Sequence, residues 1–319
     1  MSQSNNYKIH HRKQDLGKKI EQLHRAEQLA IGIIDSGSLE QLTTALDWYV
    51  ANMNCCLHAV ISSDRGDVTS FQAKYPDVTF IVFPTFPTLG EMVNTIADEC
   101  FTTYFLVVRS DMEIVRFEGA YLFSLLSSKE APAALIPAIA NSNKEIVPSM
   151  RAPKKVGNLI DPISYFPDMS STESHQTLYP IRGIGLFDRA LFQRVRSYDV
   201  EIESEYWQTL DLGLRYNLYG NTIGCTSAFI VRFPQSLSII EDRSPVDSMD
   251  RVHTRALSVE NINGKNFARK FRGHFDRKVF NDEVKKRLSY IIKKDFKTLC
   301  EEWEYTEIEK ENQNIEKNK

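Results

Sequence analysis

Acidic and aromatic side chains are concentrated in the stretch 182–219, RGIGLFDRALFQRVRSYDVEIESEYWQTLDLGLRYNLY. Its apolar start contains Gly183 and Gly185, a helix is expected at 188–195, and a second helix is expected from about Trp207 onward. Carboxylates can bind hard cations or remove a proton from a hydroxyl group, so the loop between the two helices carries residue types suited to chemistry. We expect this acidic, aromatic loop to lie at the mouth of an α/β domain.

Hydrophobic patterning predicts the elements that must position this loop. Strands are expected at 29–34, 57–61, 78–83, 104–108 and 133–139. Further helices are expected at 39–52, 71–75, 89–100 and 117–126. Continuous apolar strands that alternate with helices predict a mostly parallel sheet, buried on both faces and connected by right-handed crossovers.

Polar residues follow three of the predicted strands. They are Asp35, the segment 62–64 and the segment 109–111. The carboxyl ends of parallel strands meet at one edge of a sheet, where ligands of open α/β folds bind. These polar ends therefore predict a ligand cleft at the same edge as the acidic loop.

The bulk composition limits the classes of function. A net charge of −3 disfavours a general nucleic-acid binder, which usually has a basic excess. The five cysteines are an odd set without CxxC spacing, which favours a reducing compartment over a disulfide framework or a zinc site. No apolar run approaches 18 residues and the polar N-terminus lacks an apolar signal region, so we expect a cytoplasmic protein without a transmembrane segment.

The order of motifs in 182–219 resembles the acceptor-side half of the family-2 glycosyltransferases of the GT-A fold. FDRALF at 187–192 and YD at 198–199 match the family's helix and the G-x-F/Y-D motif that follows it. YWQTLDLGLR at 206–215 matches Y/F-W-E-D-x-D-L-x-x-R, except that Gln208 and Thr209 stand where the family has its acidic pair.

The first half of the chain resembles the nucleotide-sugar half of the same family. IDSG at 34–37 and ISSD at 61–64 stand at the family's first two strand ends, and GEMVNTI at 90–96 is the counterpart of its G-x-x-x-A-x-N motif. FLVVRSD at 105–111 stands where the family has F-L-D-x-D, with Arg109 in place of the first aspartate. The resemblance covers about 29–232 and implies a GT-A-like, Rossmann-type mixed sheet, mostly parallel and flanked by helices.

The resemblance implies roles for the residues at the strand ends. Asp35 and Asp64 would bind the nucleotide, and Asp111 would bind Mg²⁺ or Mn²⁺ beside the diphosphate of the donor. Arg109 could contact the diphosphate directly and make the metal weak or dispensable, since a guanidinium matches phosphate geometry. Structural roles remain open: Asp35 as a loop or cap acid, Asp64 as a turn residue, and Arg109 in an ion pair with an acid such as Glu113.

The resemblance also implies an acceptor site. An acid must deprotonate the acceptor hydroxyl in an inverting reaction, and Gln208 and Thr209 cannot, so Glu205 or Asp211 is expected to do so. Trp207 would stack on a sugar of the acceptor. The alternatives are that Glu205 is a solvated loop acid, that Asp211 orients the backbone or Arg215, and that Trp207 packs in the core.

The chain divides into four parts. We expect a polar lead-in helix at 1–28, the GT-A-like domain at 29–232, a helical C-terminal extension at 233–305 and a flexible tail at 306–319. The segment 141–180 reads as a long excursion. The basic run ARKFRGHFDRK at 268–278 could contact a phosphorylated acceptor or an anionic membrane surface, or could be an ordinary charged helical face.

The first hypothesis for the function is a glycosyltransferase that moves a sugar from a nucleotide-diphosphate sugar to a glycan or glycoconjugate. The second is a catalytically impaired GT-A-fold protein that binds a nucleotide sugar, a glycan or a protein partner without turnover. A nucleotidyltransferase ranks behind both, because 35–38 (DSGS) lacks the basic residues of its glycine-rich loop. The absence of a P-loop and of GxGxxG gives ATPase and dehydrogenase activities no support.

Overall fold

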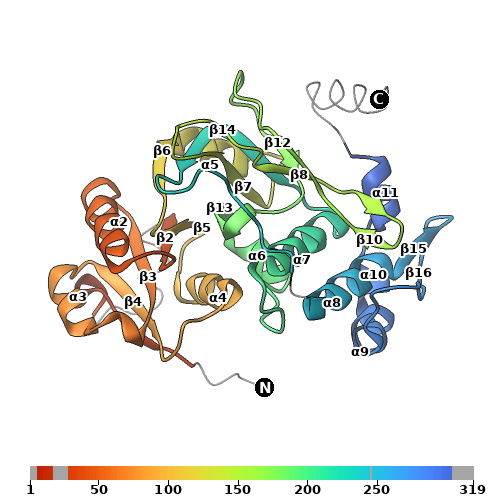
Figure 1. Ribbon diagram of the computed structural model, residues 1–319, viewed down its shortest axis with the longest axis horizontal. Coiled ribbons are helices and arrows are strands. Elements are labelled where there is room, and N and C mark those ends of the chain that lie inside the picture. The colour runs from red at the N-terminus through yellow and green to blue at the C-terminus, as the bar shows by residue number, and fades with distance from the viewer. Residues whose placement is uncertain (1–5, 17–27, 245, 304–319) are drawn as a thin grey trace.

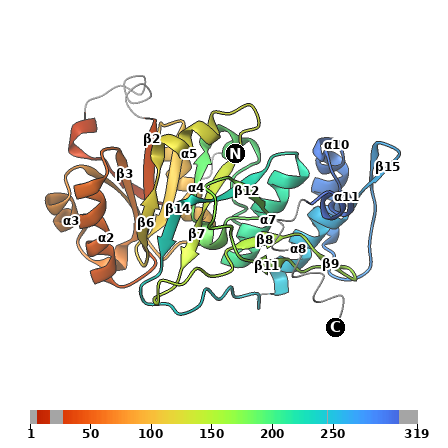
Figure 2. The same cartoon turned by 90° about the horizontal axis from the view of Figure 1, so that it is seen from above.

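A mixed sheet forms the centre of the computed structural model, which describes residues 6–16, 28–244 and 246–303 (Figures 1 and 2). Within these residues the strand order is β1-β4-β3-β2-β5-β13-β7-β14-β12, and β6 pairs with β14 beside this path. The strands are β1 (Lys8–His10), β2 (Leu29–Ile34), β3 (Cys56–Ser62), β4 (Val78–Phe83), β5 (Tyr104–Arg109), β6 (Glu113–Phe117), β7 (Ala134–Ala140), β12 (His175–Thr177), β13 (Gly185–Asp188) and β14 (Ile223–Arg232). The neighbours β4, β3, β2 and β5 are parallel, whereas β13 runs antiparallel between β5 and β7.

The central strands form because their sequences are apolar throughout. Every residue of β4 and β5 is buried, and so is every residue of β2 after its first. Such continuous burial is typical of strands with helices on both faces. The strands expected at 29–34 and 78–83 are confirmed with those bounds, and those expected at 57–61, 104–108 and 133–139 are confirmed to within a residue at each end.

Six helices among the described residues flank the sheet. They are α2 (Leu39–Asn52), α3 (Val68–Lys74), α4 (Leu89–Glu99), α5 (Gly119–Leu126), α6 (Arg189–Arg194) and α7 (Glu205–Leu218). Reciprocal capping bonds start two of them, from Ser38 and Gln41 at α2 and from Thr88 and Glu91 at α4. Helix α4 lies close against β2, since a Cβ atom at Gly32 would come within 2.4 Å of Ile96. The mixed α/β architecture expected from the sequence is therefore observed.

The C-terminal elements lie at the end of the molecule opposite α2 and α3 (Figures 1 and 2). They are α8 (Val246–Leu257), β15 (Val259–Ile262), β16 (Lys265–Ala268), α9 (Arg277–Val279), a π-helical segment η4 (Phe280–Leu288), α10 (Ser289–Ile291) and α11 (Phe296–Glu301). The extension was expected to be helical, and it also contains the β15–β16 hairpin. No described helix has both the length and the apolar character needed to cross a bilayer.

The structure differs from the expected elements in further places. The helix expected at 71–75 begins earlier, at Val68, and ends at Lys74. Residues 8–10 form an edge strand against β4, and the rest of the expected lead-in helix lies mostly outside the described residues, as does the expected flexible tail. The helix expected at 117–126 begins only at Gly119, because Glu113–Phe117 forms β6. Short elements occupy the excursion and the loops: β8 (Met150–Ala152), β9 (Lys155–Val156), β10 (Leu159–Ile160), β11 (Ile163–Tyr165), and the 3₁₀ turns η1 (Lys13–Asp15), η2 (Ser63–Arg65) and η3 (Ile181–Gly183).

Candidate active site

The guanidinium of Arg109 joins two carboxylates at the end of β5. Its Nε donates to Oδ1 of Asp111 at 3.2 Å and its Nη1 donates to Oε2 of Glu205, the first residue of α7, at 3.1 Å. Ser36, in the loop after β2, donates its hydroxyl hydrogen to the same Oδ1 at 2.7 Å. Burial acts to lower the pKa of Arg109, but the charges of Glu205 and Asp111 outweigh it and hold the pKa above its ordinary value. Arg109 is therefore a fixed positive charge.

A second arginine contacts Glu205 from the opposite side. Nη1 of Arg182 lies 3.4 Å from Oε1 of Glu205, and Nη2 donates to the carbonyl of Ile240 at 3.4 Å. The backbone of Arg182 has φ 58°, in the left-handed region that few non-glycine residues adopt. Backbone strain of this kind is frequent at functional sites. Glu205 is thus held between two guanidinium groups at the positive end of a helix dipole.

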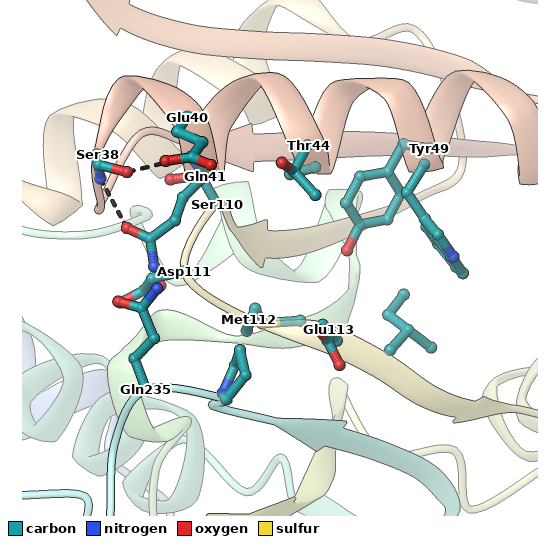
Figure 3. Close-up of a pocket in the computed structure, with 14 residues that line it drawn as sticks. Ser38, Glu40, Gln41, Thr44, Tyr49, Ser110, Asp111, Met112, Glu113 and Gln235 are labelled. Carbon is teal, nitrogen blue, oxygen red and sulfur yellow. Dashed lines mark hydrogen bonds between the residues drawn. The ribbon is translucent and has the colours of Figure 1, made fainter. Parts of the chain in front are cut away.

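Two pockets lie next to these side chains. The larger, which we call the α2 groove, has a volume of about 600 Å³ and lies between α2, the segment 110–114 and the turn 234–235 (Figure 3). The smaller, the α7 pocket, has a volume of about 320 Å³ and is bounded by Arg182, 204–206, Thr209 and 240–242. Asp111 lines the α2 groove and Glu205 lines the α7 pocket. Arg109 therefore connects the ends of both pockets through its two carboxylate partners.

The two expected nucleotide contacts have different surroundings. Asp35, at the end of β2, is 1% exposed, and its Oδ2 accepts from Nε of Arg65 at 2.5 Å. Nη2 of Arg65 also donates to the carbonyl of Gly37 at 2.6 Å, so this arginine covers the carboxylate. Burial raises the pKa of Asp35, although the bond and charge of Arg65 oppose the shift. Asp64 lies in the turn after β3 with an exposed side chain.

Asp211 belongs to a buried ion-pair cluster rather than to either of these pockets. Its Oδ2 accepts from Nε of Arg215 at 2.7 Å and its Oδ1 accepts from Nη1 of Arg255 at 3.0 Å. Arg255 also pairs with Asp199 and Glu283, which links α7 to α8 and η4. The expectation that Asp211 acts as the base is therefore corrected: its side chain is 2% exposed and both of its oxygens are bound by guanidinium groups.

Trp207 also differs from its expected role. It is 4% exposed and its ring packs between Tyr206, at a centroid distance of 4.8 Å, and His253, at 5.7 Å. A buried indole offers no free face to a sugar, so the expectation of acceptor stacking is corrected to core packing. His253 is buried too: its Nε2 accepts from the backbone N–H of Ile160 at 2.8 Å, and its Nδ1 lies 2.8 Å from the carbonyl of Met249.

The two residues at the position of the family's acidic pair have separate structural contacts. Oε1 of Gln208 accepts from the backbone N–H of Gly90, in the first turn of α4, at 2.8 Å, and its Nε2 donates to the carbonyl of Ile202 at 2.5 Å. Thr209 donates back to the carbonyls of Glu205 and Tyr206, one turn earlier in its own helix. Glu205 lies on the same face of α7 as Thr209, four residues before it, and both line the α7 pocket.

The residues around Asp111 do not fit a divalent cation. Such an ion needs several oxygen ligands, and two carboxylates close together are the usual protein contribution. Here the nearest charged neighbour of Asp111 is the guanidinium of Arg109, and its Oδ1 already accepts two hydrogen bonds. Within the described ranges no three His, Cys, Asp or Glu side chains come together in a way that could hold a metal.

Comparison with solved structures identifies the fold. The structure of GalNAc-T7 with UDP, GalNAc and Mn²⁺ matches with a TM-score of 0.56 and 12% sequence identity, over 72% of this chain and 48% of that chain. A structure of TarS 1–349 from S. aureus matches with a TM-score of 0.46 and 16% identity, over 71% of this chain and 64% of that chain. A second structure of S. aureus TarS matches with a TM-score of 0.47 and 15% identity, over 72% of this chain and 39% of that chain. No protein-family model and no curated protein matches the sequence. The chain has the GT-A fold of glycosyltransferases.

Proposed function

We propose that this protein transfers a sugar from a nucleotide-diphosphate sugar to a hydroxyl group of a glycan or glycoconjugate, with inversion at the anomeric carbon. The observation that carries the proposal is the bridge from Arg109 to Asp111 and Glu205, which places a buried cation between one carboxylate that lines the α2 groove and another that lines the α7 pocket. The reaction needs both groups: a positive charge for the leaving diphosphate and a base for the attacking hydroxyl.

Glu205 is the proposed base. As the acceptor oxygen forms its bond to the anomeric carbon, Glu205 takes the hydroxyl proton, and the bond from that carbon to the diphosphate breaks with its electron pair on the phosphate oxygen. Arg109 stabilises the negative charge that develops on this oxygen. A diphosphate that takes hydrogen bonds from Arg109 competes with Glu205 for them, so donor binding would also free the base.

The nucleoside is proposed to lie across the ends of β2 and β3, where Asp35 and Asp64 would form hydrogen bonds to the base and ribose. Asp35 can take part only if the side chain of Arg65 moves from its carboxylate. Arg109 takes the place of a metal ion in this proposal, and the metal role first expected for Asp111 is reduced to orienting Arg109. Mg²⁺ or Mn²⁺ is then dispensable for nucleotide binding.

The second candidate function is a GT-A-fold protein that binds a nucleotide sugar, a glycan or a protein partner without turnover. Gln208 favours it, because this buried amide stands in place of an acid and is committed to α4. In either case we propose a cytoplasmic location. Cys100, Cys225 and Cys300 are free thiols, as suits a reducing compartment. Contact of the basic C-terminal extension with a membrane surface stays a prediction.

Calorimetric titration of UDP and GDP, with and without Mn²⁺, tests the proposal. We expect one nucleotide to bind without metal, and Arg109→Ala to weaken its affinity by about tenfold to a hundredfold. Arg109→Lys keeps the charge but not the forked geometry of the guanidinium, so its nucleotide affinity should lie between those of the wild type and Arg109→Ala. Arg269→Ala, at an exposed position in the C-terminal extension, should bind the nucleotide as the wild type does. Binding that requires Mn²⁺ and ignores Arg109 would refute the assigned role, and absence of binding would refute the donor site.

Turnover separates the two candidates. A protein that binds the nucleotide should also hydrolyse the matching nucleotide sugar slowly when no acceptor is present, because water can replace the acceptor hydroxyl. Hydrolysis that disappears in Glu205→Gln supports the transferase. Nucleotide binding without hydrolysis favours the protein that binds without turnover. Hydrolysis that is unaffected by Glu205→Gln indicates that another group is the base.

A further inference from the structure

The α2 groove is larger than the α7 pocket, and the proposed reaction uses only its Asp111 end. Helix α2 forms one wall with its side chains from Glu40 to Tyr49, and the start of β6 forms the opposite wall (Figure 3). At about 600 Å³ the groove can hold several sugar rings or one drug-sized ligand. Its chemistry allows the class of ligand to be inferred.

The charges of the groove disfavour an anionic ligand. Its lining contains the carboxylates of Glu40, Asp111 and Glu113 and no Lys, Arg or His side chain. Arg232 pairs with Glu113 and Arg109 with Asp111, but both arginines approach from outside the lining. A phosphate or uronic acid group would meet carboxylates without a facing cation, whereas sugar hydroxyl groups can donate hydrogen bonds to them.

A buried hydroxyl group in the groove lacks a protein partner. Tyr49 is 2% exposed, and no hydrogen-bond partner is found for its hydroxyl oxygen. The hydroxyl group points from α2 into the space between this helix and the strand that carries Glu113 (Figure 3). Buried polar atoms are nearly always hydrogen-bonded in proteins, so this unpaired oxygen, which is almost closed to solvent, marks a position where a ligand supplies the partner when the neighbouring side chains shift.

The remaining lining combines an aromatic face with planar polar groups. Trp48 is 39% exposed, a high value for an indole, and its ring meets that of Tyr49 edge to face at a centroid distance of 5.0 Å. Gln41, Thr44 and Gln235 add amide and hydroxyl groups. The apolar C–H face of a pyranose packs on an aromatic ring while its equatorial hydroxyl groups bond to amides and carboxylates.

We propose that the α2 groove binds a neutral saccharide chain that runs from Trp48 toward Asp111. The binding itself is independent of catalysis. That this chain is part of the acceptor, with one end near Arg109, rests on the proposed function. The groove would then select glycans several residues long and without acidic groups, and the α7 pocket would hold the reacting end.

Calorimetric titration of the full-length protein with maltotriose, cellotriose and the N-acetylglucosamine trimer tests the inference, with trigalacturonic acid as the anionic comparison. We expect at least one neutral trisaccharide to bind at millimolar concentration or below and the anionic one to bind more weakly. Trp48→Ala should lower the affinity for the neutral trisaccharide by about tenfold, and Tyr49→Phe should lower it by about threefold to tenfold. Tyr49→Phe removes only an oxygen atom that has no partner in the fold, so this variant should remain folded.

Two matched variants control for indirect effects. Tyr216→Phe removes another buried, unpartnered hydroxyl group outside the groove, and Tyr290→Ala removes an aromatic ring that is 80% exposed on α10; both should bind the trisaccharide as the wild type does. The inference is overturned if no neutral trisaccharide binds, if the acid binds better, or if Trp48→Ala and Tyr49→Phe bind normally.

Titration of UDP and GDP with the same variants separates this inference from the proposed function. Normal nucleotide binding by Trp48→Ala, together with weakened saccharide binding, supports both. Saccharide binding by a protein that binds no nucleotide supports the groove and refutes the donor site. Nucleotide binding by a protein that binds none of the neutral trisaccharides supports the donor site and refutes the saccharide site in the α2 groove.

Discussion

Nη1 of Arg109 lies 3.1 Å from Oε2 of Glu205, which joins the last residue of β5 to the first residue of α7 across 96 positions of sequence. Arg109 ends this strand where the resembling family has an aspartate. Glu205 lies one turn before Thr209, where that family has an acid. The contact therefore joins one departure from the family's motifs to the acid nearest to the other departure.

Replacing the arginine by an acid should create a requirement for metal. Arg109→Asp places two carboxylates two residues apart, the spacing that holds a divalent cation in the resembling family. We expect nucleotide binding by this variant to be lost without Mn²⁺ and to improve by about tenfold or more with it, measured by calorimetry. Wild-type affinity should not respond to Mn²⁺, and an equal response in both proteins would count against Arg109 as the substitute for the ion.

Removing the charge of Glu205 should affect turnover more than binding. Glu205→Gln keeps the size of the side chain but cannot accept a proton, so the rate of sugar transfer or donor hydrolysis should fall by about a hundredfold to ten-thousandfold. Nucleotide affinity should rise slightly or stay constant, because Arg109 loses a competing partner. Glu203→Gln, two residues earlier and exposed, is the control and should retain full activity; if the two variants have equal rates, Glu205 is not the base.

Asp211→Asn should act on stability. The change removes the charge that pairs with Arg215 and Arg255, and breaking a buried pair from one side typically costs about 3 to 5 kcal/mol. The free energy of unfolding, measured by urea denaturation, should fall by that amount. Asp282→Asn, which disrupts an exposed pair with Lys286, should cause no measurable change. A stable but inactive Asp211→Asn protein would instead restore Asp211 to the chemistry.

The buried His253 should make the fold sensitive to mild acid. Burial lowers its pKa below the ordinary value of 6.5, even though the bond to the carbonyl of Met249 opposes the shift. As the pH falls, His253 therefore takes up a proton near pH 6.5 in the unfolded chain but only at a lower pH in the folded protein. The stability contributed by neutral His253 is complete above pH 6.5 and is lost as the pH falls below it. Protonation would also break the bond that Nε2 accepts from Ile160.

Urea denaturation between pH 7.5 and 5 measures this effect. The free energy of unfolding should decrease with falling pH in the wild type and decrease less in His253→Gln, which should also be less stable at neutral pH. His11→Gln, at an exposed position, should keep the wild-type pH dependence. If the free energy of unfolding of His253→Gln depends on pH as strongly as that of the wild type, other groups cause the acid sensitivity.

Most of the sheet was predictable because burial on both faces leaves a continuous apolar run. The strands at 29–34 and 78–83 could be bounded in this way, and the helix at 39–52 could be bounded by its cap and by apolar residues at helical spacing. The strand Lys8–His10 could not, because it pairs at the edge of the sheet and is not fully buried. Strand β6 was missed because the extra residue of a bulge, Val115, interrupts the alternation that would mark a half-buried strand.

The candidate site was only partly predictable. The sequence indicates that Arg109 and Asp111 end a strand, but the partner of Arg109 depends on where α7 begins, and Glu205 rather than the expected Glu113 fills that place. Asp211 and Trp207 match motif positions, yet α7 is buried along almost its whole length, so side chains that a half-exposed helix would offer to a ligand pack inside. Helix periodicity cannot distinguish these cases when both faces are covered.

The left-handed backbone of Arg182 limits how this site can change. A glycine would adopt φ 58° without strain, but it would leave Glu205 with Arg109 as its one remaining cationic contact among the described residues. Most other side chains would bear a similar backbone strain, and Asn or Asp, which adopt this region more readily, would still lack the guanidinium that makes the two hydrogen bonds. Mutational routes away from arginine therefore begin with a loss of either conformational fit or charge balance, and this turn is a point of low tolerance in the candidate site.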